Sequence, residues 1–102
     1  MKTKLLKNPH PGEILRLEFL EPLSLSQNAL AHAIGVPANR INEIVRGRRS
    51  VTADTDLRLG RFFGLSEGYW LRLQNDYDVL EAKRKAGRVI SGIQPYENLR
   101  AG

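Results

Sequence analysis

The 102-residue chain is 41% hydrophobic and carries a net charge of +5, which indicates one small globular domain and is typical of proteins that bind nucleic acid. It contains no cysteine, which excludes disulfides, thiolate metal sites and cysteine nucleophiles. It has neither an apolar run long enough to span a membrane nor a signal peptide, so we expect a cytoplasmic protein without membrane contact.

The first predicted helix follows a polar, flexible lead-in formed by residues 1–10. Pro11 fits the first helical position, where its missing N–H costs nothing, and Pro22 ends the helix. Apolar residues at helical spacing predict a broad core-facing stripe, and two further leucines are expected to pack the connection that follows. These core candidates are Ile14, Leu15, Leu17, Phe19, Leu20, Leu23 and Leu25.

Two short helices are predicted next, one at residues 27–34 and one from Pro37 to the residue before Gly47. Ser26 is a suitable N-cap for the first, and Gly35 supplies the positive φ of a tight turn between them. Ala31 is small where the two helices approach each other. The apolar contacts are expected from Ala29, Leu30, Ala33, Ile34, Val36, Ile41, Ile44 and Val45. A helix pair joined by such a turn is the geometry that places one helix in a DNA major groove, so the stretch predicts a helix-turn-helix.

A fourth helix is predicted from the N-cap residue Thr52 to the glycine at position 64, with Asp54 and Asp56 in its favourable first turn. Its core candidates are Leu57, Leu59, Phe62 and Phe63.

The fifth helix is expected to be capped by Ser66 and to run as far as Ala86, with Gly87 as its stop. Its apolar seam consists of Trp70, Leu73, Tyr77 and Leu80. Residues 88–102 are expected to be more extended than helical. The prediction is an all-α bundle of about five helices, with a DNA-binding domain at residues 11–80 and a C-terminal extension at residues 81–102.

The core stretch LAHAIGVPANRINEIVRGRRSVT resembles the lambda-repressor-like helix-turn-helix domains. Together with HPGEILRLEFLEPL before it and LRLGRFFGLSEGYWLRLQNDYD after it, the chain resembles the HigA-type antitoxins of type II toxin–antitoxin modules over residues 9–80. The segment WLRLQNDYD carries the distinction, because generic phage-type repressors lack it. Two residues depart from the pattern: Gly60 stands where alanine is expected, and Gly68 stands where proline or a better helix former is usual.

The resemblance implies a dimer that binds a palindromic operator in double-stranded DNA and represses its own operon. It also implies a partner toxin, a HigB-type ribosome-dependent mRNA endonuclease, which this chain holds inactive. The alternative is a free-standing transcriptional regulator without a toxin. The sequence shows no nucleotide-binding glycine motif and no constellation of catalytic or metal-ligating residues, so we expect neither an enzyme nor a cofactor.

The third helix is expected to present Ala38, Asn39 and Glu43 to the bases. The amide of Asn39 suits adenine or a phosphate, and the alternative is a local helix cap. Ala38 suits a thymine methyl group, or is a plain helix former. Glu43 suits cytosine N4, or pairs with Arg40 or Arg46 one turn away.

Further residues of the pair are expected at phosphates. Arg40 suits a phosphate first and a guanine edge second, and Asn42 suits the backbone or is simply solvated. By resemblance, Gln27 is a phosphate clamp at a helix N-terminus. A basic turn after the third helix is expected to neutralise flanking phosphates through Arg46, Arg48 and Arg49.

The C-terminal extension is expected to serve dimerisation or partner contact, through Val89, Ile90 and Ile93. The basic cluster at residues 83–88 is interpreted first as a solvated helix end and second as an additional DNA contact.

Overall fold

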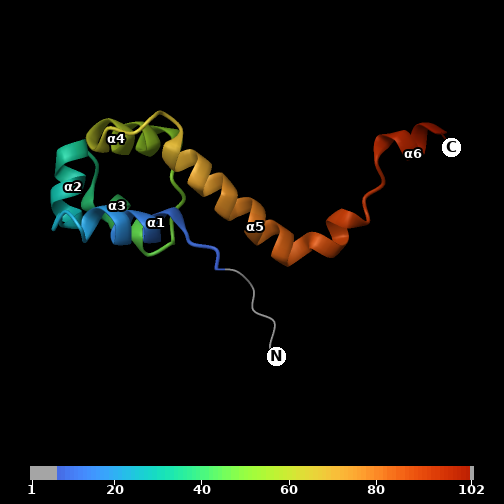
Figure 1. Ribbon diagram of the computed structural model, residues 1–102, viewed down its shortest axis with the longest axis horizontal. Coiled ribbons are helices and arrows are strands. Elements are labelled where there is room, and N and C mark those ends of the chain that lie inside the picture. Colours follow the sequence, from blue (N-terminus) through green and yellow to red (C-terminus); the bar gives the residue numbers. More distant parts are fainter. Residues whose placement is uncertain (1–6, 102) are drawn as a thin grey trace, which may run out of the picture.

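The computed structural model describes residues 7–101, and every regular element in this range is helical (Figure 1). The chain enters through α1 (Pro11–Ile14), which continues directly into the π-helical turn η1 (Leu15–Leu20). The remaining helices are α2 (Gln27–Ile34), α3 (Ala38–Val45), α4 (Ala53–Phe63), α5 (Tyr69–Ser91) and α6 (Tyr96–Ala101). None of the helices in the described range has both the length and the apolar character needed to cross a membrane.

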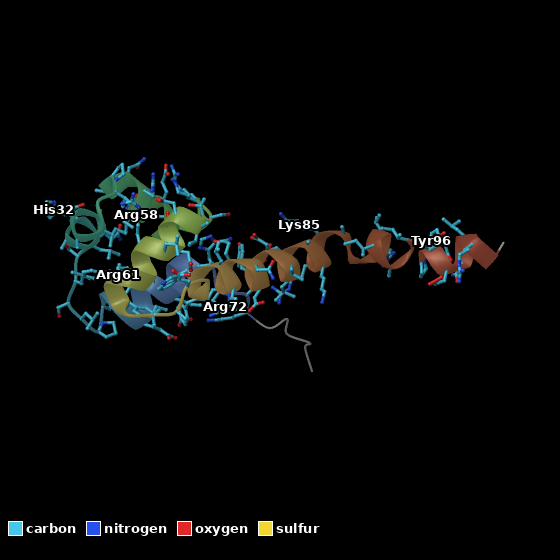
Figure 2. All side chains as sticks on the ribbon, turned by 90° about the horizontal axis from the view of Figure 1, so that it is seen from above. His32, Arg58, Arg61, Arg72, Lys85 and Tyr96 are labelled. Carbon is cyan, nitrogen blue, oxygen red and sulfur yellow. The ribbon has the colours of Figure 1, made fainter. Side chains whose placement is uncertain are left out.

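The elements α1 to α4 and the start of α5 pack into a body, from which the rest of α5 projects as an arm ending in α6 (Figure 1). In Figure 2, Arg58 and Arg61 lie on the body, whereas Arg72, Lys85 and Tyr96 follow one another along the arm. The expected all-α fold with a helix-turn-helix and a C-terminal extension is confirmed.

The core lies between α1 and η1, the helix pair, α4 and the first turn of α5. Trp70 is completely buried in it, with its ring centroid 5.1 Å from that of Phe19. The buried apolar residues are Leu15, Leu20, Leu30, Ala31, Ile34, Val36, Ile41, Ile44, Val51, Leu59 and Trp70. The predicted core residues of the helix-turn-helix are therefore buried, except for Ala29 and Ala33, which are exposed, and Val45, which is partly buried.

The predicted apolar stripe of residues 14–20 was too broad, because the backbone there is π-helical. A turn that closes i to i+5 places Leu15 and Leu20 on the same face, and both are buried. Leu17 is turned outward, and Leu23 is exposed in the connection that follows. Among the core candidates of the fourth helix, Leu57 and Phe62 were predicted wrongly, because they lie on the solvent side of α4.

The start of α1 rests directly on the backbone of α3. A Cβ atom added to Gly12 would lie 1.7 Å from the carbonyl oxygen of Ile44, so only glycine allows the two backbones to approach this closely. Pro11 occupies the first helical position as expected, and the His10 ring accepts a hydrogen bond from the Gly12 N–H at 2.9 Å. Asn8, from the predicted lead-in, donates to the Tyr77 carbonyl oxygen on α5 at 3.0 Å.

The start of α5 is capped by Asp56 rather than by Ser66, so the predicted cap was wrong. Gly68, at φ +89°, turns the chain so that the helix begins only at Tyr69, beyond the reach of a Ser66 cap. The buried Asp56 carboxylate accepts hydrogen bonds from the backbone N–H groups of Gly68 and Trp70, both at 2.7 Å. Thr52 does precede α4 as expected, but its hydroxyl makes no capping bond to the backbone.

The expectation of an extended tail was also wrong. The α5 helix continues through Gly87 to Ser91, with a kink at Ala86, and α6 follows Pro95. β-Branched residues such as Val89 and Ile90 favour strands only where a neighbouring strand pairs with their backbone. The described residues contain no strand, so the helix satisfies these backbone groups locally.

Candidate nucleic-acid interface

The outer face of α3 is the exposed side of the helix-turn-helix. Ile41 and Ile44 are completely buried, so the 3.6-residue period directs Asn39 and Glu43 to the opposite side. Asn39 is exposed, as is Ala38 at the start of the helix, and Glu43 is partly buried. The structure thus brings the three predicted base-reading residues to one exposed helix.

The helix pair has the predicted N-cap at its start and the predicted glycine in the turn between its helices. The Ser26 hydroxyl accepts from the Ala29 N–H at 3.0 Å, and Gly35 adopts φ +72°. The Asn42 amide donates to the Gln27 side-chain oxygen at 3.3 Å, which joins the start of α2 to the middle of α3. Gln27 and Asn42, both expected at the DNA backbone, are therefore neighbours at the N-terminus of α2.

The basic turn after α3 is shaped by Gly47 at φ +74°. The N–H of Arg48 donates to the Glu43 carbonyl oxygen at 2.8 Å, and that of Gly47 donates to the Ile44 carbonyl oxygen at 2.9 Å, the two bonds of a Schellman motif. This reversal brings Arg49 back beside Glu43, and the two form an ion pair at 2.6 Å. Glu43 is therefore paired, as one interpretation held, but with Arg49 rather than with Arg40 or Arg46.

Arg46 and Arg48 differ from Arg49 in having no carboxylate partner within the described residues. Both are exposed and flank the outer face of α3. Their charges face solvent and make this side of the helix-turn-helix basic.

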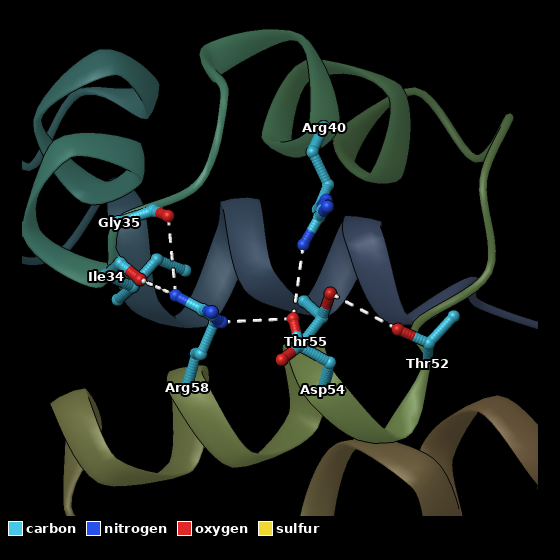
Figure 3. Close-up of polar contacts among 7 residues, drawn as sticks. All are labelled: Ile34, Gly35, Arg40, Thr52, Asp54, Thr55 and Arg58. Atoms are coloured by element: carbon cyan, nitrogen blue, oxygen red, sulfur yellow. Dashed lines mark hydrogen bonds and ion pairs between the residues drawn. The ribbon is translucent and has the colours of Figure 1, made fainter.

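Arg40 lies on the flank of α3 that faces α4. Its guanidinium contacts the Asp54 carboxylate at 3.2 Å, and the same carboxylate oxygen receives the Arg58 Nε at 3.0 Å (Figure 3). Arg58 also donates to the carbonyl oxygens of Ile34 at 2.7 Å and Gly35 at 3.3 Å, at the C-terminal end of α2. The i, i+4 spacing of Asp54 and Arg58 in the sequence could have indicated this ion pair. The contacts of the pair with Arg40 on α3 and with the end of α2 depend on tertiary packing.

The chain is similar to known helix-turn-helix proteins in both sequence and structure. The sequence profile described as helix-turn-helix matches residues 17–70. Virulence-associated protein I of Dichelobacter nodosus is 55% identical over 75 residues, which are 74% of this chain and 69% of that protein. The Pseudomonas aeruginosa antitoxin HigA, solved with the higBA promoter, is 43% identical with a TM-score of 0.83, over 87% of this chain and 98% of that chain.

The chain belongs to the HigA group of helix-turn-helix antitoxins. A HigA-family antidote protein of Coxiella burnetii agrees, with 43% identity and a TM-score of 0.84 over 89% of this chain and all of that chain. The resemblance of the chain to HigA-type antitoxins is thereby confirmed. The departure at Gly68 has a structural reason, because its positive φ makes the turn that starts α5.

Proposed function

We propose that this HigA-type chain binds double-stranded DNA with α3 in the major groove and represses its own operon. The observation that carries the proposal is the exposed, basic-flanked α3 in a chain that shares its fold with a HigA antitoxin solved with its promoter. Asn39 reads bases, together with Ala38, and Glu43 either reads cytosine or keeps Arg49 in place. The protein acts in the cytoplasm, where the operator is.

The backbone contacts in this proposal come from both sides of the helix pair. Gln27 at the start of α2 holds a phosphate, where helix N–H groups attract anions, and Asn42 assists it. Arg46 and Arg48 neutralise phosphates on the other side. The Arg49–Glu43 pair is partly exposed, so opening it for a phosphate costs little.

A second copy of the chain completes the proposed repressor at a palindromic operator. The arm carries apolar side chains that the rest of residues 7–101 leaves open to solvent: Val89 is 72% exposed and Ile93 is 67% exposed. Val79 and Ile90 on the same arm are also large apolar residues exposed to solvent. The dimer interface is therefore assigned to this C-terminal extension.

The proposed partner of the dimer is a HigB-type ribosome-dependent mRNA endonuclease, which the chain neutralises. A free-standing regulator is the second candidate, and it differs only in having no toxin.

A promoter–reporter fusion in cells tests repression: the chain should lower expression from the promoter of its own operon, and Asn39→Ala should relieve that repression. Co-purification of the tagged chain with the product of the adjacent gene supports the antitoxin, and loss of growth inhibition by that product on co-expression completes the test. A neighbour that neither binds nor inhibits growth favours the regulator.

A further inference from the structure

Asp54 pairs with two arginines, Arg40 of α3 and Arg58 of its own helix α4 (Figure 3). One of its oxygens accepts from Arg58 Nε at 3.0 Å and from Arg40 at 3.2 Å. Arg58 is also bonded to the carbonyl oxygens of Ile34 and Gly35, so it remains anchored without the carboxylate. For Arg40, Asp54 is the one ionic partner among residues 7–101.

The contact between Arg40 and Asp54 is accessible and exchangeable. The Arg40 side chain is 31% exposed and that of Asp54 is 58% exposed, so water screens the pair and its opening costs little. Arg40 belongs to the first turn of α3, and its long side chain leaves that helix on the flank next to the outer face. A guanidinium binds carboxylate and phosphate oxygens in the same forked geometry, so either anion suits it.

We propose that Asp54 holds Arg40 on α4 in the free protein and yields it to a backbone phosphate when DNA binds. Asp54 is thus a positioning residue: it competes with every phosphate that Arg40 would contact and thereby lowers affinity for all DNA alike. This inference rests on the proposed DNA binding. Asp54 on α4 thus controls whether Arg40 on α3 is available to DNA.

A double-mutant cycle tests the inference, using wild type, Asp54→Ala, Arg40→Ala and the double variant. Affinities are measured by fluorescence anisotropy on the protein's own promoter fragment and on a shuffled duplex of equal length. Asp54→Ala should bind both duplexes about two- to fivefold more tightly than wild type, the range expected for release of an exposed ion pair. In the Arg40→Ala background the same substitution should change affinity much less. Thermal unfolding of each variant confirms that all are folded at the temperature of measurement.

Three outcomes of the cycle would overturn the inference. An equal gain in both backgrounds would mean that Asp54 acts only as a negative charge near DNA, and no gain would mean that it does not compete for Arg40. A gain on the promoter alone would place Arg40 on a base instead of a phosphate.

The salt dependence supplies a second readout. Arg40→Ala should reduce the slope of log affinity against log salt by about 0.9, the value for one phosphate contact. An unchanged slope would show that Arg40 stays on Asp54 in the complex. Failure of the wild type to bind either duplex would instead overturn the proposed function itself, which separates the two failures.

Discussion

The Oδ1 atom of Asp56 accepts a hydrogen bond from the backbone nitrogen of Trp70 at 2.7 Å, and this contact joins α4 to the start of α5. The carboxylate is only 1% exposed, and it also binds the N–H groups of Gly68 and Leu71. One buried acidic group thus satisfies three of the backbone donors that a helix N-terminus leaves unpaired. Through it, the arm is held to the DNA-binding body.

Asp56→Ala should lower the free energy of unfolding by about 3 kcal/mol, because it leaves buried N–H groups without acceptors. Asp56→Asn retains one acceptor oxygen and should cost roughly half as much. Urea denaturation measures both. The matched control is Asp76→Ala, which removes an exposed carboxylate from α5 and should change stability by less than about 0.5 kcal/mol. Equal losses for Asp56→Ala and the control would contradict the capping role.

Gly12→Ala should destabilise the protein by roughly 2 kcal/mol or more, because its Cβ would overlap the Ile44 carbonyl oxygen and push α1 from α3. Gly87→Ala is the control, since its Cβ would meet nothing within 4 Å. That substitution should stabilise α5 by about 0.5–1 kcal/mol. Thermal unfolding distinguishes the two, and a neutral Gly12→Ala would mean that the contact between α1 and α3 is loose.

His10 should make stability depend on pH. Burial lowers the pKa of His10, although the charges of Asp78 and Glu13 oppose this shift. The folded protein therefore holds the imidazole neutral, as an acceptor for the Gly12 N–H, while the unfolded chain takes up a proton near pH 6.5. Stability is fully present above that pH and falls as the pH drops toward the lower folded-state pKa.

Denaturation at pH 7.5 and pH 5.5 tests this dependence. His10→Asn keeps a neutral N-cap acceptor, so it should lose less stability between the two pH values than wild type does. Identical losses in the two proteins would show that His10 does not contribute.

Asn39→Ala and Arg48→Ala should impair DNA binding in different ways. Asn39→Ala should reduce affinity for the promoter by about 1–3 kcal/mol and leave a shuffled duplex nearly unaffected, because base contacts carry the discrimination. Arg48→Ala should weaken both duplexes equally and flatten the salt slope by about 1, because phosphates carry no sequence. Titrations at several salt concentrations check both, and an equal loss on the two duplexes for Asn39→Ala would remove its base-reading role.

Ile93→Asp should convert the proposed dimer into a monomer, because it places a charge among the exposed apolar side chains of the arm. Light scattering should give twice the chain mass of 11.5 kDa for wild type and the single chain mass for the variant. Ser91→Asp introduces the same charge at an exposed polar position of the arm and should remain dimeric. A wild type of single chain mass would contradict the interface outright.

The helix-turn-helix was predictable because its determinants are local. Ser26 caps α2 from within the same turn, Gly35 adopts the positive φ that its position demands, and Ile41 and Ile44 follow the helical period. The cap of α5 was not predictable in this way. The sequence places Ser66 near the helix start, but the acceptor is supplied by Asp56, which belongs to another helix.

The candidate site shows the same division between local and tertiary determinants. The exposure of Ala38 and Asn39 follows from the period of α3. The partner of Glu43 was missed because the turn at Gly47 reverses the chain and substitutes Arg49 for a residue one helical turn away. The bond from Arg40 to Asp54 likewise required knowledge of how α4 packs beside α3.

The proposed function requires that α3 recognises DNA from the promoter of its own operon. Equilibrium binding of the wild-type protein to its promoter fragment and to a shuffled duplex, at about 150 mM salt, measures this recognition. We expect at least a roughly thousandfold preference for the promoter, in the range of specific DNA-binding proteins. Equal affinity for the two duplexes, or no binding to either, would contradict it.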